Sequence, residues 1–376
     1  MIYFDYTATT KPNQLLLDLH TKISNEYWYN SETLYHEGER SHNLYLKSEK
    51  VALDALNLKH HKILFTSGAT ESNNTAIYSA CHAYLNINNT KPKHIITTLI
   101  EHASVLKAFK DLENRGFNVT YLKPNNEGII NVEDLKQAIT PDTILVSIMW
   151  VNNLMGTVQP IKDVINLLKE YPRIKLHVDA VQGITKIVPD FDLNDIDYLT
   201  ISGHKLNGLK GTGMLCFNEN LFVEFLQGGH QQYGFRPGTV DLAGVVCMAK
   251  TISLAAKDIE EKYNDVLKKY NYLINNLKDE KHLYLNYSKK HFSPYILSIA
   301  FYNLKGETAL HALEEKGIIV GTGSACNSQS KEIENTYKYS LDGIANPINV
   351  IRISISLETT YEELDQLITN LKQIGK

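Results

Sequence analysis

The segment Thr143-Ile-Leu-Val-Ser-Ile-Met149 is the clearest indication of the fold. It is an uncharged and mainly apolar run, which is typical of parallel strands that are covered on both faces. Shorter runs that we also predict to be strands occur on either side of it, with stretches of helical character between them. These runs are Ile63–Thr66, His94–Thr98, Asn118–Leu122, Ile174–Val178, Tyr198–Ile201 and Gly213–Phe217. Strands that alternate with helices predict an α/β fold with a mostly parallel sheet.

The pattern changes after about residue 240. Leu242–Leu277 contains no proline and no internal capping signal, and we predict one long helical region there. Short strands mixed with helices follow, which is typical of an α+β unit. Residues 328–347 are polar without a clear period and are predicted to form a loop. Thr360-Tyr-Glu-Glu363 fits a capping box and predicts the start of the last helix. We therefore expect a second, smaller domain in the C-terminal part of the chain.

The composition narrows the class of protein. The chain has 376 residues, of which 43% are hydrophobic and 21% charged, and its formal net charge is −4. This mixture argues against a disordered or fibrous chain and against a polybasic protein that binds nucleic acid or a membrane surface. The first residues turn polar at once and no run of about 18 apolar residues occurs. We therefore expect a cytoplasmic protein without a signal peptide or a membrane span.

The chain has four widely spaced cysteines and no CxxC motif. They are Cys81, Cys216, Cys247 and Cys326. This spacing fits neither a disulfide framework nor a zinc site, and we expect free thiols and no bound metal.

The tetrapeptide Ser202-Gly-His-Lys205 is the sharpest local motif. A lysine on a tight turn can be enclosed in a pocket, where loss of water lowers its pKa and favours Schiff-base formation with a carbonyl compound such as pyridoxal phosphate (PLP). Ser202 and His204 flank the lysine and carry groups that bind phosphate. A surface turn with a solvated lysine explains the same four residues equally well.

Two further segments favour the first interpretation. Asp179 ends an apolar strand in His177-Val-Asp-Ala-Val-Gln182, and a carboxylate at this end of a parallel strand points into the ligand crevice. There it can pair with a protonated pyridine nitrogen, and Gln182 can donate to the ring oxygen. A helix N-cap is the alternative role for Asp179. Ser67-Gly-Ala-Thr70 passes from a strand into a helix and is suited to binding one phosphate, although many such turns look alike.

These segments are part of a longer ordered series of motifs. In chain order the series is Asp5…Ala8-Thr-Thr10, Gly68-Ala-Thr-Glu71, Glu101-His-Ala-Ser-Val105, Val151-Asn-Asn153 with Gly156-Thr-Val-Gln-Pro160, Asp179-Ala-Val-Gln182, Ser202-Gly-His-Lys205, Gly228-Gly229…Gln231, Arg236…Gly238-Thr239, Gly323-Ser-Ala-Cys326 and Arg352-Ile-Ser354. It resembles the NifS/IscS-type cysteine desulfurases, which belong to class V of the fold-type-I PLP enzymes, and the resemblance extends over nearly the whole chain.

The resemblance implies a specific architecture. A large PLP-binding domain of residues 12–250 contains a mostly parallel seven-stranded sheet. A smaller α+β domain combines residues 1–11 with 251–376 and carries the catalytic cysteine loop at about 321–345.

The resemblance also implies a role for each matching residue at the cofactor. Lys205 holds PLP as a Schiff base, Asp179 pairs with the pyridine nitrogen, Gln182 contacts the ring oxygen, and His102 stacks on the ring and transfers protons. The remaining cofactor-binding residues, several of them at the phosphate, are Ala69, Thr70, Asn153, Ser202 and His204, with Thr239 reaching across from a second subunit. A homodimer is therefore implied.

The implied substrate is L-cysteine, whose carboxylate binds Arg352 with help from Asn153. The products are L-alanine and a persulfide on a thiol of the enzyme. Cys326 is the predicted nucleophile because Gly321–Ser330 is small and polar and suited to moving between pocket and surface. The other cysteines lie in predicted helices or an apolar strand, where free cysteine usually behaves as a buried small hydrophobe.

The persulfide would pass to a sulfur-acceptor protein, either a ThiI-type sulfurtransferase for tRNA thiolation or an iron–sulfur scaffold. Two alternatives remain at this point. One is another class V enzyme, a selenocysteine lyase or an aminotransferase, although an aminotransferase does not need Cys326. The other is a PLP-binding scaffold without catalysis, suggested by departures from the usual family residues. These departures include Tyr35, Leu154, His230 and Ser356.

Overall fold

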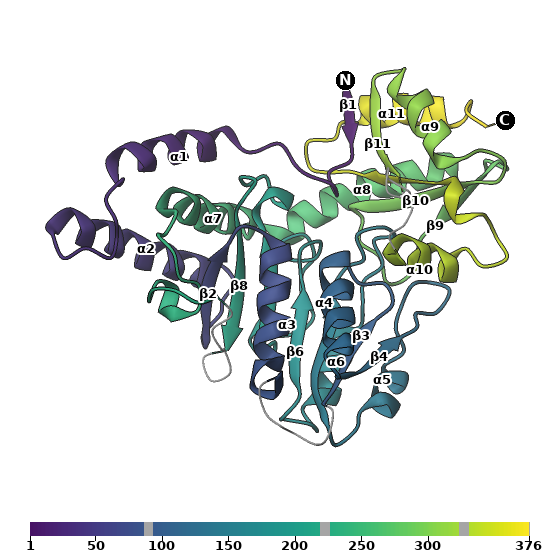
Figure 1. Cartoon of the computed structure of the whole chain (residues 1–376). Helices are drawn as coiled ribbons and strands as arrows, with labels where there is room; N and C mark the ends of the chain where they lie inside the picture. Colours follow the sequence, from purple (N-terminus) through teal and green to yellow (C-terminus); the bar gives the residue numbers. More distant parts are fainter. Residues whose placement is uncertain (86–92, 219–225, 323–330, 376) are drawn as a thin grey trace.

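The computed structural model describes residues 1–85, 93–218, 226–322 and 331–375 (Figure 1). Its centre is a seven-stranded sheet with strand order β2-β8-β7-β6-β5-β3-β4. The strands in that order are His61–Thr66, Gly213–Asn218, Tyr198–Ser202, Lys175–Asp179, Thr143–Met149, His94–Thr98 and Asn118–Leu122. β8 is antiparallel to β2 and β7, and the other neighbouring pairs are parallel. The predicted α/β class with a mostly parallel sheet is confirmed.

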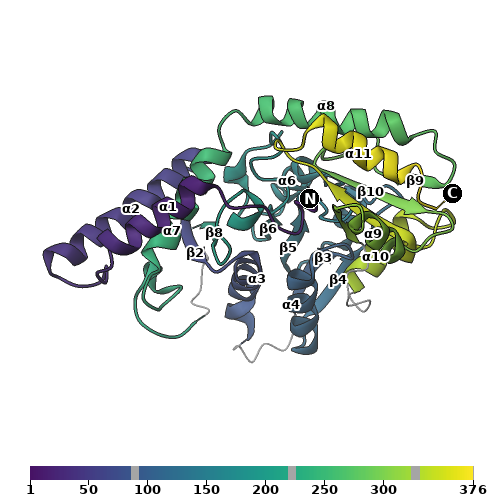
Figure 2. The ribbon, with the colours of Figure 1, turned by 90° about the horizontal axis from the view of Figure 1, so that it is seen from above.

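Helices cover both faces of this sheet, as Figure 2 shows for α3 and α4 on one side and α6 on the other. Successive residues of a strand point to opposite faces. Accordingly, Leu145 of β5 packs in the cluster that contains Phe109 of α4, whereas Val146 packs in the cluster that contains Val164 of α6. This two-sided burial explains the uninterrupted apolar sequence of β5. The helices of this part are α3 (Ala69–Leu85), α4 (Ala103–Asn114), α5 (Val132–Ala138), α6 (Ile161–Leu168) and α7 (Leu242–Ala255).

A second sheet has five strands in the order β1-β11-β12-β10-β9. The strands in that order are Ile2–Phe4, Ile318–Thr322, Val350–Ser354, Ile296–Phe301 and Leu283–Asn286. β1 lies parallel to β11, so the beginning of the chain is built into a sheet that is otherwise formed by its C-terminal part. The helices that follow α7 are α8 (Ile259–Leu277), α9 (Gly306–Glu314), α10 (Lys331–Ser340) and α11 (Tyr361–Leu371). The predicted domain boundaries at 11/12 and 250/251 stay a prediction.

Near the N-terminus, α1 (Gln14–Glu26) and α2 (His36–Ala55) extend to one side of the molecule, and both pack on α7 (Figure 1). Within the described ranges, no helix combines the length and the apolar character that crossing a membrane requires.

The prediction of one helix over Leu242–Leu277 is wrong. α7 ends at Ala255 and α8 begins at Ile259, because Asp258 adopts a left-handed conformation with φ 50°. Nζ of Lys262 donates to the carbonyl oxygens of Leu254 and Ala255 at 3.2 and 3.3 Å. The side chain of Lys262 thus satisfies carbonyls that would accept from the next turn in a continuous helix.

The prediction of a loop over 328–347 is wrong for its central part, which forms α10. Tyr337 and Leu341, four positions apart, are buried in an apolar cluster with Leu154. This short apolar contact stabilises a helix that is otherwise too polar for its period to be recognised. The capping box at Thr360 and Glu363 is confirmed at the start of α11.

Candidate active site

A cavity of about 730 Å³ lies at the carboxyl ends of β5, β6 and β7. Every predicted cofactor- or substrate-binding residue lines it except Thr239. The predicted residues in its wall are Ala69, Thr70, His102, Asn153, Asp179, Gln182, Ser202, His204, Lys205 and Arg352. Thr239 is exposed, and its contribution to the site of a second subunit stays a prediction. The topology thus brings together residues that are far apart in the sequence.

Asp179 and His102 belong to one hydrogen-bonded network in the cavity wall. Asp179 is 6% exposed, and its Oδ2 accepts from Nδ2 of Asn73 at 2.8 Å. The same Asn73 nitrogen lies 2.9 Å from Oγ of Ser104, which in turn is 2.8 Å from Nδ1 of His102. No α-helix begins at Asp179, whose Oδ1 accepts from the backbone of Val181 in a turn. The alternative role of Asp179 as a helix N-cap is therefore wrong.

His102 is itself the N-cap of α4 and accepts from the backbone N–H of Ser104. The imidazole therefore serves the helix terminus and also lines the cavity. The cap of a helix and a place in the cavity wall are therefore compatible roles for this residue.

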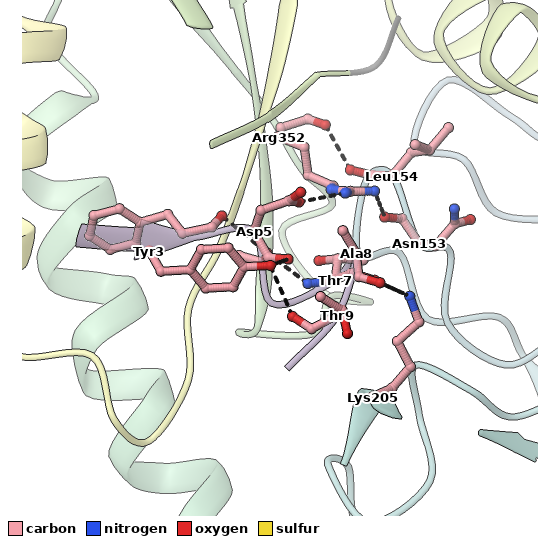
Figure 3. Close-up of polar contacts among 12 residues, drawn as sticks. Tyr3, Asp5, Thr7, Ala8, Thr9, Asn153, Leu154, Lys205 and Arg352 are labelled. Carbon is pink, nitrogen blue, oxygen red and sulfur yellow. Dashed lines mark hydrogen bonds and ion pairs between the residues drawn. The ribbon is translucent and has the colours of Figure 1, made fainter. Parts of the chain in front are cut away.

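Lys205 ends the short 3₁₀-helix Gly203–Lys205 that follows β7. Its Nζ donates to the carbonyl oxygens of Thr7 and Ala8 at 2.5 and 2.6 Å (Figure 3). Burial and the nearby Arg352 lower the pKa of Lys205 to about 8. The alternative of a solvated surface lysine is wrong, because this amine is enclosed and is held by Thr7, which lies 198 positions away in the sequence.

Another part of the cavity wall, formed by the start of α3 and the turn after β7, presents groups suited to binding an anion. Gly68 precedes α3 with φ 151°, and Thr70 lies in the first turn of this helix. Ser202 and His204 reach the same cavity from the β7 turn. Burial and the neighbouring lysines, Lys205 foremost, lower the pKa of His204 to about 4, so its imidazole is neutral at physiological pH.

Arg352 on β12 is 8% exposed and has an acidic partner within the chain (Figure 3). Its Nη2 donates to Oδ1 of Asp5 at 2.6 Å, and its Nη1 donates to the carbonyl oxygen of Asn153 at 3.1 Å. The sequence analysis assigned Arg352 to the substrate carboxylate but did not assign a role to Asp5. The signal was present, because Asp5 opens the first of the matched motifs. Sequence reasoning also missed other residues of the cavity wall, namely Thr7, Met149 and Lys210.

Cys326, the predicted nucleophile, lies outside the described residues. The other three cysteines are buried free thiols, as predicted. Burial raises the pKa of Cys81 to about 12 and that of Cys247 to about 11, and it also raises the pKa of Cys216. Thiols in such surroundings are poor nucleophiles.

The departure at Leu154 has a structural explanation. The side chain is 3% exposed and packs with Tyr337 and Leu341. It therefore connects the turn that carries Asn153 to α10.

The chain matches proteins of one family over nearly its full length. The family model "Aminotransferase class-V" matches residues 2–367. A "NifS/IcsS protein homolog" of Lactobacillus delbrueckii subsp. bulgaricus is 39% identical over 380 residues, covering 100% of this chain and 97% of that protein. A "Cysteine desulfurase IscS" of Methanosarcina thermophila is 36% identical over 376 residues, covering 99% of this chain and 91% of that protein.

Solved structures agree with these sequence matches. A "NIFS-LIKE PROTEIN" superposes with a TM-score of 0.89 at 29% identity and covers 99% of this chain and 98% of its own. "SspA in complex with cysteine" superposes with a TM-score of 0.79 at 29% identity and covers 96% of this chain and 100% of its own. With the fold, the cavity and these matches in agreement, the chain belongs to the class V aminotransferase family and, within it, to the NifS/IscS cysteine desulfurases.

Proposed function

We propose that this protein converts L-cysteine to L-alanine and takes up the sulfur as a persulfide on Cys326. The observation that carries this proposal is the convergence of Lys205, Asp179, His102 and Arg352 on one cavity. The names of the relatives support the reaction, and the structurally similar SspA was solved in complex with cysteine.

The residues of the cavity fit PLP. Asp179 is a buried carboxylate held by two neutral donors, Nδ2 of Asn73 and the backbone of Val181, which leaves it suited to a protonated pyridine nitrogen. The N-terminus of α3, with Ser202 and His204, would hold the phosphate. PLP held in this site would supply an electron sink that weakens the Cα–H and C–S bonds of the substrate.

The chain's own residues supply binding, proton transfer and the nucleophile. Arg352 and Asn153 would hold the α-carboxylate of cysteine. Because its pKa is lowered to about 8, the Lys205 amine is partly unprotonated near neutral pH and suited to accepting the Cα proton. The Cys326 thiolate then attacks the substrate sulfur. A sulfur–sulfur bond forms and the carbon–sulfur bond breaks, and its electron pair stays with Cβ. Protonation at Cβ, together with return of a proton from the Lys205 ammonium to Cα, completes alanine.

The persulfide would next be transferred to an acceptor protein, a ThiI-type sulfurtransferase or an iron–sulfur scaffold. The functional unit would be a homodimer in which Thr239 of one chain completes the phosphate site of the other. The exposed position of Thr239, away from the cavity of its own chain, is compatible with this arrangement.

The deciding experiment is an alanine assay with purified protein, PLP and L-cysteine, in the presence and absence of a reducing thiol. We expect alanine from the parent protein. The Cys326→Ser variant should retain the absorbance of bound PLP and produce no protein persulfide. A persulfide located on Cys81, Cys216 or Cys247 by mass spectrometry would contradict the assignment of Cys326. Bound PLP without alanine, even with candidate acceptor proteins added, would favour the scaffold alternative.

A further inference from the structure

The contact between Asp5 and Arg352 is the feature that the proposed reaction leaves unexplained. Asp5 directly follows β1, and its backbone is placed by a bridge to Ser354 of β12. The hydroxyl of Tyr3 donates to the carbonyl oxygens of Asp5 and Thr9, at 2.9 and 3.0 Å, which closes this segment into a compact corner (Figure 3). Asp5 is therefore held by its own surroundings, independently of Arg352.

The guanidinium of Arg352 has N–H groups that Asp5 and Asn153 do not use. A guanidinium has five N–H groups in a fixed plane. Asp5 accepts from Nη2 through Oδ1, and Asn153 accepts from Nη1. Nε has no hydrogen-bond partner among the described residues although it is buried. Because two fixed acceptors hold the plane, the unused N–H groups keep a defined direction in the cavity wall.

The space for this pair depends on Gly321 of β11, which lies opposite Arg352 in the sheet. A Cβ at this position would lie 2.6 Å from Oδ1 of Asp5 and 2.9 Å from Nη2 of Arg352. Gly321 is not in a left-handed conformation, so alanine is tolerated by the backbone and only the contact is affected. Because Gly321 has no side chain, the ion pair between Asp5 and Arg352 fits next to β11 at this position.

We propose that Asp5 is a positioning residue that orients the Arg352 guanidinium for the α-carboxylate of the amino-acid substrate. This inference rests on the proposed function, in which Arg352 binds that carboxylate. Asp5 also acts electrostatically on the Schiff-base lysine. Arg352 lowers the pKa of Lys205, whereas Asp5 and Asp179 raise it, and Lys186 and His204 are the other titratable groups close to this amine.

The test compares Asp5→Asn and Gly321→Ala with the parent. Asp5→Asn removes the charge of the acceptor, and Gly321→Ala keeps both charges but displaces the pair. Both variants should raise KM for L-cysteine about tenfold, the loss of roughly one charge-assisted hydrogen bond, with kcat nearly unchanged. Asp195→Asn, which removes one charge of an exposed ion pair with Lys169, is the matched control and should leave KM unchanged. If Asp5→Asn does not fold, Gly321→Ala carries the test.

A second readout is independent of turnover. In cofactor-free protein, the pH dependence of acetylation at Lys205, followed by mass spectrometry, reports the pKa of its amine. Asp5→Asn should lower this pKa, because the group that opposes Arg352 is lost. A role for Asp5 in stability alone would change thermal stability without changing KM for L-cysteine. An unchanged or lower KM for Asp5→Asn would overturn the inference, and an unchanged pKa of Lys205 would contradict the electrostatic effect of Asp5 on this amine.

Arg352→Gln separates this inference from the function on which it rests. If Arg352→Gln raises KM strongly and Asp5→Asn does not, Asp5 is not a positioning residue and the proposed function stands. If Arg352→Gln leaves KM unchanged, the carboxylate-binding role of Arg352 itself is wrong.

Discussion

Lys186 is a half-buried lysine beside the cavity that holds Gln182. Its Nζ donates to Oε1 of Gln182 at 3.0 Å and lies 5.9 Å from the ring centroid of Tyr295. Burial, together with the charge of Lys205, lowers the pKa of Lys186 to about 7. The unfolded chain keeps this proton up to the usual pKa of 10.5, so the free energy of unfolding rises with pH between these two values. Lys205, with a pKa of about 8, contributes in the same direction.

We therefore expect Lys186→Met to reduce this pH dependence. Urea unfolding of cofactor-free protein at about pH 7 and about pH 9.5 measures the difference. The gain in stability at the higher pH should be smaller in the variant than in the parent. Lys169→Met, at an exposed lysine, should keep the parental gain. An equal gain in both variants would show that the Lys186 amine is not desolvated.

The cysteines give a second prediction at the level of single residues. Cys81, Cys216 and Cys247 are buried and have raised pKa values, so a thiol reagent should modify them only slowly in the native protein at about pH 8. Cys326→Ser should then show no rapidly reacting thiol before unfolding and three reactive thiols in denaturant. A rapid phase that persists in Cys326→Ser would place an exposed thiol among these three.

Most residues of the candidate site were predictable from sequence because each belongs to a short motif next to a strand or helix end. Asp179 and Ser202, at the ends of β6 and β7, are examples. Asp5 was not assigned, because its role depends on the pairing of β1 with β11 and of β11 with β12. Its contact with Arg352 joins residues that are 347 positions apart, and no local pattern records such a contact.

At the level of elements, the same distinction explains which predictions were wrong. The start of α11 was predicted correctly because a capping box is a local signal. The break between α7 and α8 was not predicted, because it is produced by one residue in a left-handed conformation, Asp258, and no glycine or proline marks it in the sequence. α10 was missed because its stability depends on apolar contacts with Leu154 and its neighbours.

The break at Asp258 can be tested by substitution. In a left-handed conformation, glycine avoids a steric cost that Asp258 bears, so Asp258→Gly should stabilise the protein by about 0.5 to 1 kcal/mol. Asn264→Gly, within α8, should instead destabilise it by about 0.3 kcal/mol. Thermal unfolding of both variants measures the two effects. Destabilisation by both would mean that the helix continues through residue 258.

The ion pair between Glu71 and Arg236 connects the start of α3 to the segment that leads to Thr239. Nη2 of Arg236 lies 3.1 Å from Oε2 of Glu71, and the backbone N–H of Ser67 donates to the same carboxylate at 2.7 Å. Burial disfavours the charge of Glu71, but Arg236 and Ser67 together bring its pKa below the usual 4.5. The stabilisation by this pair is therefore complete above about pH 4.5 and is lost as the pH falls through the pKa of the folded state.

We expect Arg236→Gln to lower the free energy of unfolding by roughly 1 to 3 kcal/mol at neutral pH. The difference from the parent should decrease as the pH falls through the lowered pKa of Glu71, because below that pKa this carboxylate is protonated in both proteins. Urea unfolding across this pH range provides the measurement. A difference that does not depend on pH would mean that Arg236 stabilises the protein by packing alone.

For the whole molecule, the proposed sharing of Thr239 between subunits can be tested by complementation. Lys205→Ala chains lack the Schiff-base lysine, and Thr239→Val chains lack the hydroxyl. In a mixed dimer, Thr239 of the first chain would complete a site that contains Lys205 of the second. Mixed dimers should therefore recover PLP binding at one of their two sites. If mixing restores no PLP binding, Thr239 does not act across the interface.

The parallel pairing of β1 with β11 also has a consequence for protein synthesis. β1 leaves the ribosome before every strand of the seven-stranded sheet, but its partner, residues 318–322, emerges only after that whole sheet. The N-terminal segment therefore has no β11 to pair with while the strands of the large sheet are synthesised and fold. Arg352 is translated later still, so the ion pair between Asp5 and Arg352 forms only after residue 352 has left the ribosome. A truncated translation product that ends before residue 352 lacks this pair, and a nascent chain therefore has the proposed substrate site only after synthesis has passed residue 352.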